Sequence, residues 1–179
     1  ALSAEPSRTS AFTAMTAIRH AGGFVSFDPN IREDLWQDEH LLRLCLRQAL
    51  QLADVVKLSE EEWRLISGKT QNDRDICALA KEYEIAMLLV TKGAEGVVVC
   101  YRGQVHHFAG MSVNCVDSTG AGDAFVPGLL TGLSSTGLST DEREMRRIID
   151  LAQRCGALAV TAKGAMTALP CRQELESEK

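Results

Sequence analysis

The hydrophobic positions of the chain follow two alternating spacings. Short apolar runs of four or five residues, typical of buried strands, are separated by longer segments in which apolar residues recur at helical spacing. The segments expected to be strands are 24–27, 55–58, 86–90, 97–100 and 104–108. The segments expected to be helices are 9–20, 41–52, 60–66, 72–84, 124–133 and 141–160. This alternation predicts an α/β fold, with a mainly parallel sheet covered by helices on both faces.

Polar residues follow the first expected strand, in the stretch Asp28-Pro29-Asn30-Ile31-Arg32. Open α/β sheets bind their ligands at the carboxyl ends of the strands, so these polar residues stand at the edge of a candidate site. A turn fixed by proline and flanked by solvated charges is the alternative that the residues leave open.

The second expected strand runs into Ser59-Glu60-Glu61-Glu62. A serine followed three residues later by a glutamate has the spacing of a capping box, in which each side chain accepts a hydrogen bond from the backbone amide of the other residue. This structural role alone could explain both Ser59 and Glu62.

The third expected strand runs into Thr91-Lys92-Gly93-Ala94-Glu95-Gly96. Two glycines that are three residues apart suit a turn that approaches a ligand closely. They suit a plain hairpin equally well, so the spacing alone leaves both interpretations open.

The stretch Asp117-Ser118-Thr119-Gly120-Ala121-Gly122-Asp123-Ala124-Phe125 carries the most candidate chemistry. Its glycines let backbone N–H groups turn toward one point, and the following helix adds positive potential there, so a phosphate oxygen is the natural guest. Asp123, kept ionised by the helix N-terminus, could accept the proton of an alcohol that attacks phosphorus. A glycine-rich turn with Asp123 as an ordinary helix cap is the alternative.

The same stretch resembles the C-terminal signature of the ribokinase-like (PfkB) carbohydrate kinases, and the resemblance extends over nearly the whole chain. It implies a three-layer α/β/α sandwich with a mainly parallel central sheet. It also implies ATP-dependent phosphorylation of a primary hydroxyl of a sugar or nucleoside, with Asp123 as the base in contact with the acceptor. The anion hole and the base would be formed by four consecutive residues, Gly120, Ala121, Gly122 and Asp123.

The resemblance further implies ATP, Mg²⁺ and a monovalent cation such as K⁺ as cofactors. Arg32 would contact the substrate or its phosphates, and Glu62 would organise Mg²⁺ and its waters. The family has asparagine where this chain has Ser59, which leaves the role of Ser59 open. The residues expected near ATP are Lys57, Glu62, Thr91, Gly93, Gly96 and Gly122.

By the same resemblance, a loop and the end of the last helix would hold the monovalent cation. Its oxygen ligands would come from Asp117, Thr119, Ala159, Ala162 and Gly164. Ala168 stands where related kinases offer a serine hydroxyl, so this site would lack one ligand.

Family members are considerably longer than this chain, and the sequence matches their C-terminal part. We therefore expect residues 1–179 to be the C-terminal part of a single kinase domain, without the N-terminal part and its lid. That lid would join two copies into a homodimer. Aminoimidazole riboside is the acceptor expected first, and fructose is the alternative. A nucleotide- or sugar-binding relative without turnover represents the competing class.

Composition narrows the partners. The net charge of −5 argues against nucleic acid or an anionic membrane surface, and no apolar run approaches the roughly 18 residues that span a bilayer. The GxxxxGK[ST] motif is absent, so the chain is not a Walker-type kinase. The six cysteines are scattered without a CxxC pair, which is typical of small buried side chains in a reducing cytoplasm. His106 and His107 are adjacent on a strand and cannot bind one metal together.

Overall fold

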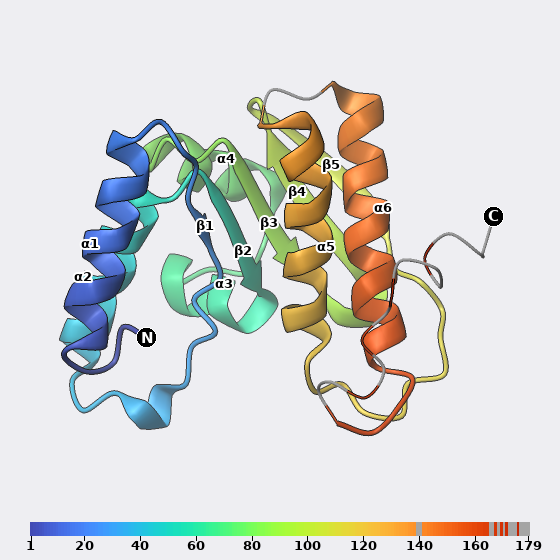
Figure 1. Cartoon of the computed structure of the whole chain (residues 1–179), viewed down its shortest axis with the longest axis horizontal. Helices are drawn as coiled ribbons and strands as arrows, with labels where there is room; N and C mark the ends of the chain where they lie inside the picture. The colour runs from blue at the N-terminus through green and yellow to red at the C-terminus, as the bar shows by residue number, and fades with distance from the viewer. Residues whose placement is uncertain (139–140, 165–166, 168, 170, 172–174, 176–179) are drawn as a thin grey trace. The chain divides into compact units, whose positions relative to one another are not determined.

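The structure is a computed structural model that describes residues 1–179 except 139–140, 165–166, 168, 170, 172–174 and 176–179. The chain folds into two compact units. The first unit contains residues 1–91 and 98–107, and the second contains residues 92–97 and 108–179. Each unit is described by itself, with the element labels of Figure 1.

A five-stranded sheet with the order β1-β2-β3-β4-β5 organises the first unit. Its strands are β1 (Ser26–Phe27), β2 (Val55–Ser59), β3 (Met87–Thr91), β4 (Gly96–Tyr101) and β5 (Gln104–Ala109). The pairings β1–β2 and β2–β3 are parallel, with Ser59 opposite Thr91. β4 and β5 are joined by Arg102 and Gly103, whose φ angles of 51° and 73° suit a tight antiparallel hairpin. The sheet is therefore mixed, with three parallel strands.

Four helices cover the first unit's core: α1 (Ser7–His20), α2 (Glu39–Leu52), α3 (Glu60–Ser67) and α4 (Asp73–Glu82). Their starting points follow from short polar side chains that satisfy free amides. Asp38 caps α2, Ser59 caps α3 and Asn72 caps α4, each by accepting a hydrogen bond from a backbone N–H of the first turn.

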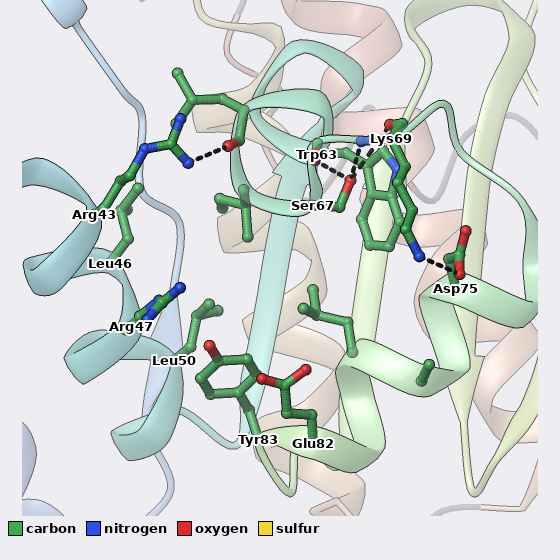
Figure 2. Close-up of a pocket in the computed structure, with 14 residues that line it drawn as sticks. Arg43, Leu46, Arg47, Leu50, Trp63, Ser67, Lys69, Asp75, Glu82 and Tyr83 are labelled. Carbon is green, nitrogen blue, oxygen red and sulfur yellow. Dashed lines mark hydrogen bonds and ion pairs between the residues drawn. The ribbon is translucent and has the colours of Figure 1, made fainter. Parts of the chain in front are cut away.

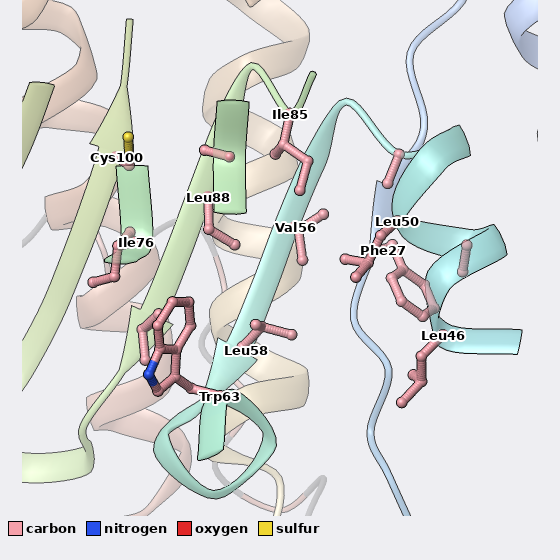
Figure 3. Close-up of a cluster of buried hydrophobic side chains, with 14 of the residues drawn as sticks. Phe27, Leu46, Leu50, Val56, Leu58, Trp63, Ile76, Ile85, Leu88 and Cys100 are labelled. Atoms are coloured by element: carbon pink, nitrogen blue, oxygen red, sulfur yellow. The ribbon is translucent and has the colours of Figure 1, made fainter. Parts of the chain in front are cut away.

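The core of the first unit lies between α2, α3, α4 and alternate residues of the strands (Figure 3). Residues two apart on a strand point to the same face, which is why Val56 and Leu58 both join this cluster. Trp63 of α3 and Ile76 of α4 are fully buried in it. Burial of such side chains is the main force that holds the helices on the sheet, at about 1.5–3 kcal/mol each.

The second unit is dominated by two helices that lie side by side, α5 (Ala121–Thr136) and α6 (Glu142–Ala159) (Figure 1). Small residues let the helices approach closely. A Cβ on Gly128 would lie 2.9 Å from the Cα of Ala152, and one on Gly132 would lie 2.8 Å from the side chain of Ile148. Larger residues at these two glycines would force the helices apart.

The elements expected from hydrophobic spacing are all present, and the α/β class is confirmed. Most boundaries lie within two residues of those expected, and two differences affect the site. Only Ser26 and Phe27 pair with β2, so β1 is shorter than the apolar run 24–27. α5 begins at Ala121 instead of residue 124, because Gly120 adopts a left-handed conformation (φ 86°) that starts the helix directly after it. Pro127 therefore lies in the second turn of α5.

Candidate functional site

The carboxyl ends of the three parallel strands meet at one edge of the first unit's sheet. Phe27 is level with Val56, and Ser59 is level with Thr91, so the segments that follow β1, β2 and β3 leave the sheet side by side. The hydroxyl of Thr91 donates a hydrogen bond to the carbonyl of Leu58, at 3.2 Å. The structure therefore brings together the loop that begins at Asp28, the start of α3 and the end of β3, as the sequence predicts.

Lys57 and Asp28 form an ion pair at this edge. The Nζ atom of Lys57 lies 3.4 Å from Oδ1 and 3.3 Å from Oδ2 of Asp28. The Lys57 residue is only 7% exposed, which is rare for lysine. Burial raises the pKa of the Asp28 carboxyl, while the nearby Lys57 charge lowers it and that of Glu62 raises it. Lys57, expected near ATP, is in this structure the counter-ion of Asp28.

Glu62 is buried, and both of its carboxylate oxygens accept hydrogen bonds from backbone amides. Oε2 accepts from the N–H of Ser59 at 2.7 Å, and the Ser59 hydroxyl accepts in turn from the N–H of Glu62 at 3.2 Å. The capping box predicted from the spacing is thus confirmed. Oε1 accepts from the N–H of Ile31 at 2.9 Å, which ties the loop after β1 to α3. The remaining lone pairs of this carboxylate suit hydrated Mg²⁺, whose shell is Glu62's expected role.

The loop after β1 lines a cavity of about 230 Å³ in the first unit. Asp28, Asn30 and Arg32 all contribute to the lining. Asn30 has a φ of 43°, a left-handed conformation that asparagine tolerates better than most residues. Arg32 is exposed, and its side chain makes no hydrogen bond or ion pair with the described residues, so its guanidinium is available to a ligand.

Sequence reasoning missed the residues that close this cavity opposite the loop. Leu35 and Trp36, at the end of a short 3₁₀ helix (η1, Glu33–Leu35), line it together with residues of α1 and α2. In the sequence, the only sign of these lining residues was a tryptophan in a polar stretch shortly after Arg32. Large aromatic residues in a polar loop are common where a ligand binds.

A second cavity of the first unit, of about 220 Å³, lies among α2, α3 and α4 (Figure 2). Arg43 and Arg47 of α2 and the Lys69–Asp75 ion pair surround its mouth. None of the residues expected to carry chemistry lines it. It is therefore separate from the edge of the sheet where the predicted residues gather.

In the second unit, Gly120 lies at the start of α5, in the stretch where the sequence predicts an anion-binding loop. Gly120 is the N-cap, and it offers no side chain to satisfy the free amides of the first turn. The amide of Ala121 donates to the carbonyl of Ser118 at 3.3 Å. We find no acceptor among the described residues for the amides of Gly122 and Asp123. These two donors and the helix N-terminus suit a phosphate oxygen.

Asp123 lies in the first turn of α5, with its side chain exposed. It is not the helix cap, since Gly120 holds that position, so the ordinary capping role is excluded for it. This position is near the positive end of the helix dipole, which attracts negative charge.

Asp117 links the anion-binding loop to the segment after α6. Its Oδ1 accepts from the N–H of Thr119 at 2.9 Å, and its Oδ2 accepts from the N–H of Gly164 at 2.9 Å. The backbone N–H groups of Val116 and Asp117 donate to the carbonyl of Val160, at 2.8 and 3.2 Å. Hydrogen bonds from the side chain and then the backbone of Thr119, and from Gly164, lower the pKa of Asp117.

This arrangement fits the expected monovalent cation site. Asp117 and Thr119 lie beside the segment that contains Ala162 and Gly164, and Ala159 is the last residue of α6, where the carbonyls carry the negative end of the helix dipole. Such oxygens are the usual ligands of hard cations. Ala168 lies outside the described residues. Among the residues described, no group of three or more His, Cys, Asp or Glu side chains could hold a metal by itself.

The turn between β3 and β4 contains the two glycines expected near ATP. It is a short 3₁₀ helix (η2, Gly93–Glu95), closed by a hydrogen bond from the N–H of Lys92 to the carbonyl of Gly96 at 2.8 Å. Gly96 has a φ of 111°, and a Cβ there would collide with the carbonyl of Phe108. Gly96 is therefore required by the local backbone, whatever it contacts in addition.

Gly156 is a second residue that sequence reasoning missed. It lies in α6, and a Cβ there would be 3.1 Å from the carbonyl oxygen of Ala121, the first residue of α5. Gly156 thus allows α6 to pass close beside the anion-binding loop. The richness of α6 in small residues was the only signal in the sequence.

Comparison with known proteins agrees with these features. Residues 2–172 match the pfkB family carbohydrate kinase. The chain is 99% identical to a fructokinase of Escherichia coli over all 179 residues, which is 58% of the length of that relative. In the described part of the chain, no helix is both long enough and apolar enough to span a membrane.

Solved structures are similar over almost the whole chain. A double mutant of Vibrio cholerae fructokinase, with fructose, ADP and potassium ion bound, has a TM-score of 0.89 and 41% identity, and the match covers 97% of this chain and 56% of that one. Aminoimidazole riboside kinase from Salmonella enterica, with aminoimidazole riboside and an ATP analogue, has a TM-score of 0.88 and 35% identity over 97% and 58% of the two chains. The chain belongs to the pfkB family of carbohydrate kinases.

Proposed function

We propose that this chain, together with the additional segment of its longer relatives, transfers a phosphoryl group from ATP to a primary hydroxyl of fructose. The observation that carries the proposal is the start of α5, where Gly120 leaves two backbone amides free beside Asp123. The choice of fructose rests on the identity of 99% to Escherichia coli fructokinase over the full chain.

In the proposed reaction, the acceptor oxygen bonds to the γ-phosphorus of ATP while the bond from that phosphorus to the bridging oxygen breaks, and ADP leaves. The proton of the hydroxyl passes to the Asp123 carboxylate. The anion hole at residues 120–123 stabilises the charge of the transferring group through the helix dipole and the backbone amides of Gly122 and Asp123, which have no acceptor among the described residues. Positioning and charge neutralisation supply most of the catalysis in this chemistry.

Each unit contributes its own proposed cofactor contacts. Lys57, Glu62 and Thr91 belong to the first unit, while Gly93, Gly96 and Gly122 belong to the second. Mg²⁺, when bound with ATP, neutralises phosphate charge. Glu62 would hold the metal's waters while its backbone contacts keep it in place. K⁺ would be held by oxygens of the residues around Asp117 and would order the loop that carries the anion hole.

Arg32 is the residue of the first unit that we propose as a substrate or phosphate contact, because its guanidinium is exposed at the cavity beside Asp28. A homodimer formed through the additional segment, and a location in the cytoplasm, are also proposed. The described cysteines are free thiols, as a reducing compartment would keep them.

The acceptor is tested with the chain joined to the segment that the Escherichia coli relative has in addition. We expect kcat/KM to be higher for fructose than for aminoimidazole riboside or ribose, because polar groups that pair with an acceptor's own hydroxyls reject a wrong ligand strongly. A higher kcat/KM for the riboside would refute fructose and leave the kinase reaction intact. If ATP and Mg²⁺ yield no ADP with any acceptor, the protein is a binding relative without turnover.

A further inference from the structure

Two cysteines from distant parts of the sequence meet in the first unit. The Sγ atoms of Cys77, in α4, and Cys100, in β4, are 2.8 Å apart. This is closer than two sulfur atoms of separate thiols normally approach, and it brings residues 23 positions apart into direct contact. Cys77 is half-buried, whereas Cys100 is only 2% exposed. Neither residue has a part in the proposed phosphoryl transfer.

We propose that Cys77 and Cys100 form a site of reversible oxidation, at which a hydroperoxide converts the two thiols into an intramolecular disulfide that links α4 to β4. The geometry is favourable because no element has to move far for the sulfurs to bond. The scattered positions of the cysteines in the sequence gave no sign of this pair.

The oxidation proceeds in two balanced steps. The sulfur of Cys77, the more accessible of the two, attacks the peroxide: an S–O bond forms, the O–O bond breaks, and the leaving oxygen takes up the thiol proton and departs as water from hydrogen peroxide or as an alcohol from an organic hydroperoxide. The sulfur of Cys100 then attacks that of the Cys77 sulfenic acid: the S–S bond forms, the S–O bond breaks, and the thiol proton of Cys100 leaves in a second water. The two thiols lose two electrons and the peroxide gains them.

The surroundings favour this order of events. Burial, and then the hydrogen bond with Cys77, raise the pKa of the Cys100 thiol to about 12, so Cys100 is poorly suited to react with a peroxide first. Cys77 Sγ also lies 3.5 Å from the carbonyl of Gly103 in the turn between β4 and β5. The resolving thiol is therefore held in contact with the accessible one before oxidation begins.

A disulfide here would close a loop of the unfolded chain and thereby stabilise the first unit. It would add a covalent link where α4 and the hairpin already interact through Asp73 and His107, whose Oδ2 and Nε2 atoms are 3.0 Å apart. Oxidation should therefore raise the melting temperature, and reduction should reverse the rise.

The test treats the purified chain with hydrogen peroxide, digests it without reductant and identifies linked peptides by mass spectrometry. We expect a peptide pair joined through Cys77 and Cys100, a melting temperature raised by several degrees, and reversal of both by dithiothreitol. Cys77→Ser should abolish the link and the rise, whereas Cys115→Ser, at an exposed cysteine, should change neither.

The proposal is overturned if Cys77 is oxidised to sulfinic or sulfonic acid without a link to Cys100. It is also overturned if the linked peptides contain other cysteines in place of this pair. Because the mapping is done on the unsubstituted chain, the result does not depend on whether a variant folds.

Discussion

Replacement of Lys57 by methionine decides between the two roles of this residue. Methionine is unbranched like lysine and one atom shorter, and it removes the charge together with the N–H donors. If Lys57 is mainly the counter-ion of Asp28, the substitution leaves a buried carboxylate without a partner and lowers the free energy of unfolding. If Lys57 is mainly a ligand of ATP, the substitution raises the KM for ATP and leaves stability unchanged.

The size of the effect follows from the geometry of the ion pair. The side chains of Lys57 and Asp28 are 9% and 16% exposed and their charged atoms are 3.3 Å apart. Loss of one partner of a fully buried pair costs about 3–5 kcal/mol. Asp28 can avoid part of this cost by taking up a proton, which costs at most about 4 kcal/mol at pH 7 for a carboxyl with an unfolded pKa of about 3.9. We therefore expect a loss of about 2–3 kcal/mol at neutral pH.

The direction in which the stability loss of Lys57→Met changes with pH follows from the raised pKa of Asp28. Removal of the Lys57 charge raises the folded-state pKa of Asp28 further above its unfolded value, so the penalty is fully present above that folded pKa, shrinks as the pH falls below it and vanishes below the unfolded pKa. At pH 5 protonation costs only about 1.5 kcal/mol, so the loss should shrink to that value or below.

Urea unfolding of the wild-type chain and the variant at the two pH values measures this loss. Lys81→Met is the matched control, since Lys81 is exposed near the end of α4 and should change stability by no more than about 0.5 kcal/mol. An equal loss at both pH values, or no loss at neutral pH, would refute the counter-ion role.

Three further variants test other contacts. Gly156→Ala should lower the melting temperature, because the added Cβ would press on the carbonyl of Ala121. In the protein of the relatives' length it should also lower kcat. An unchanged kcat would show that the loop at the start of α5 tolerates the displacement of Ala121. Glu62→Gln should lower the free energy of unfolding, measured in urea, by about 1–2 kcal/mol, because a side-chain amide cannot accept hydrogen bonds from both backbone N–H groups. It should also raise the Mg²⁺ concentration that gives the half-maximal rate. A loss of stability with an unchanged Mg²⁺ dependence would leave only the capping role. Hydrogen bonds from Thr119 and Gly164 lower the pKa of Asp117, so the ionised Asp117 side chain stabilises the fold above its unfolded pKa, and this stabilisation is lost as the pH falls through the folded pKa. The difference in free energy of unfolding between the wild-type chain and Asp117→Asn should therefore shrink in acid. A difference that stays constant with pH would contradict this.

Local signals in the sequence were sufficient for most of the fold. The helix start near Asn72 and the capping box at Ser59 depend on residues within one turn of each other, so spacing alone predicts them. α2 begins at Glu39, two residues before the predicted start, because Asp38 caps it. The start of α5 was placed three residues late, because Gly120 and Gly122 resemble loop residues. A glycine in the left-handed conformation just before a helix and a glycine inside a longer turn look alike in the sequence, so the residue types alone do not show where α5 begins.

The contacts that shape the candidate site depend on distant residues, which explains why the sequence did not reveal them. Lys57 meets Asp28 only because β1 and β2 pair in a particular register. Glu62 reaches the amide of Ile31 for the same reason. Cys77 meets Cys100 only after α4 has packed on the sheet. A lysine within a buried strand or a cysteine in an apolar run can be noticed in the sequence, but the residue that it contacts is determined by the tertiary structure.

The most direct test of the account is the steady-state kinetics of Asp123→Asn in the protein of the relatives' length, with ATP and fructose. Asparagine keeps the shape of the side chain and removes its basicity, while the amides at the start of α5 remain. We predict that kcat falls by about 10²–10⁴-fold or more and that the dissociation constant of ATP changes little. A kcat near that of the wild type, with a raised KM for fructose, would show that Asp123 holds the acceptor without taking its proton, and would contradict the central claim.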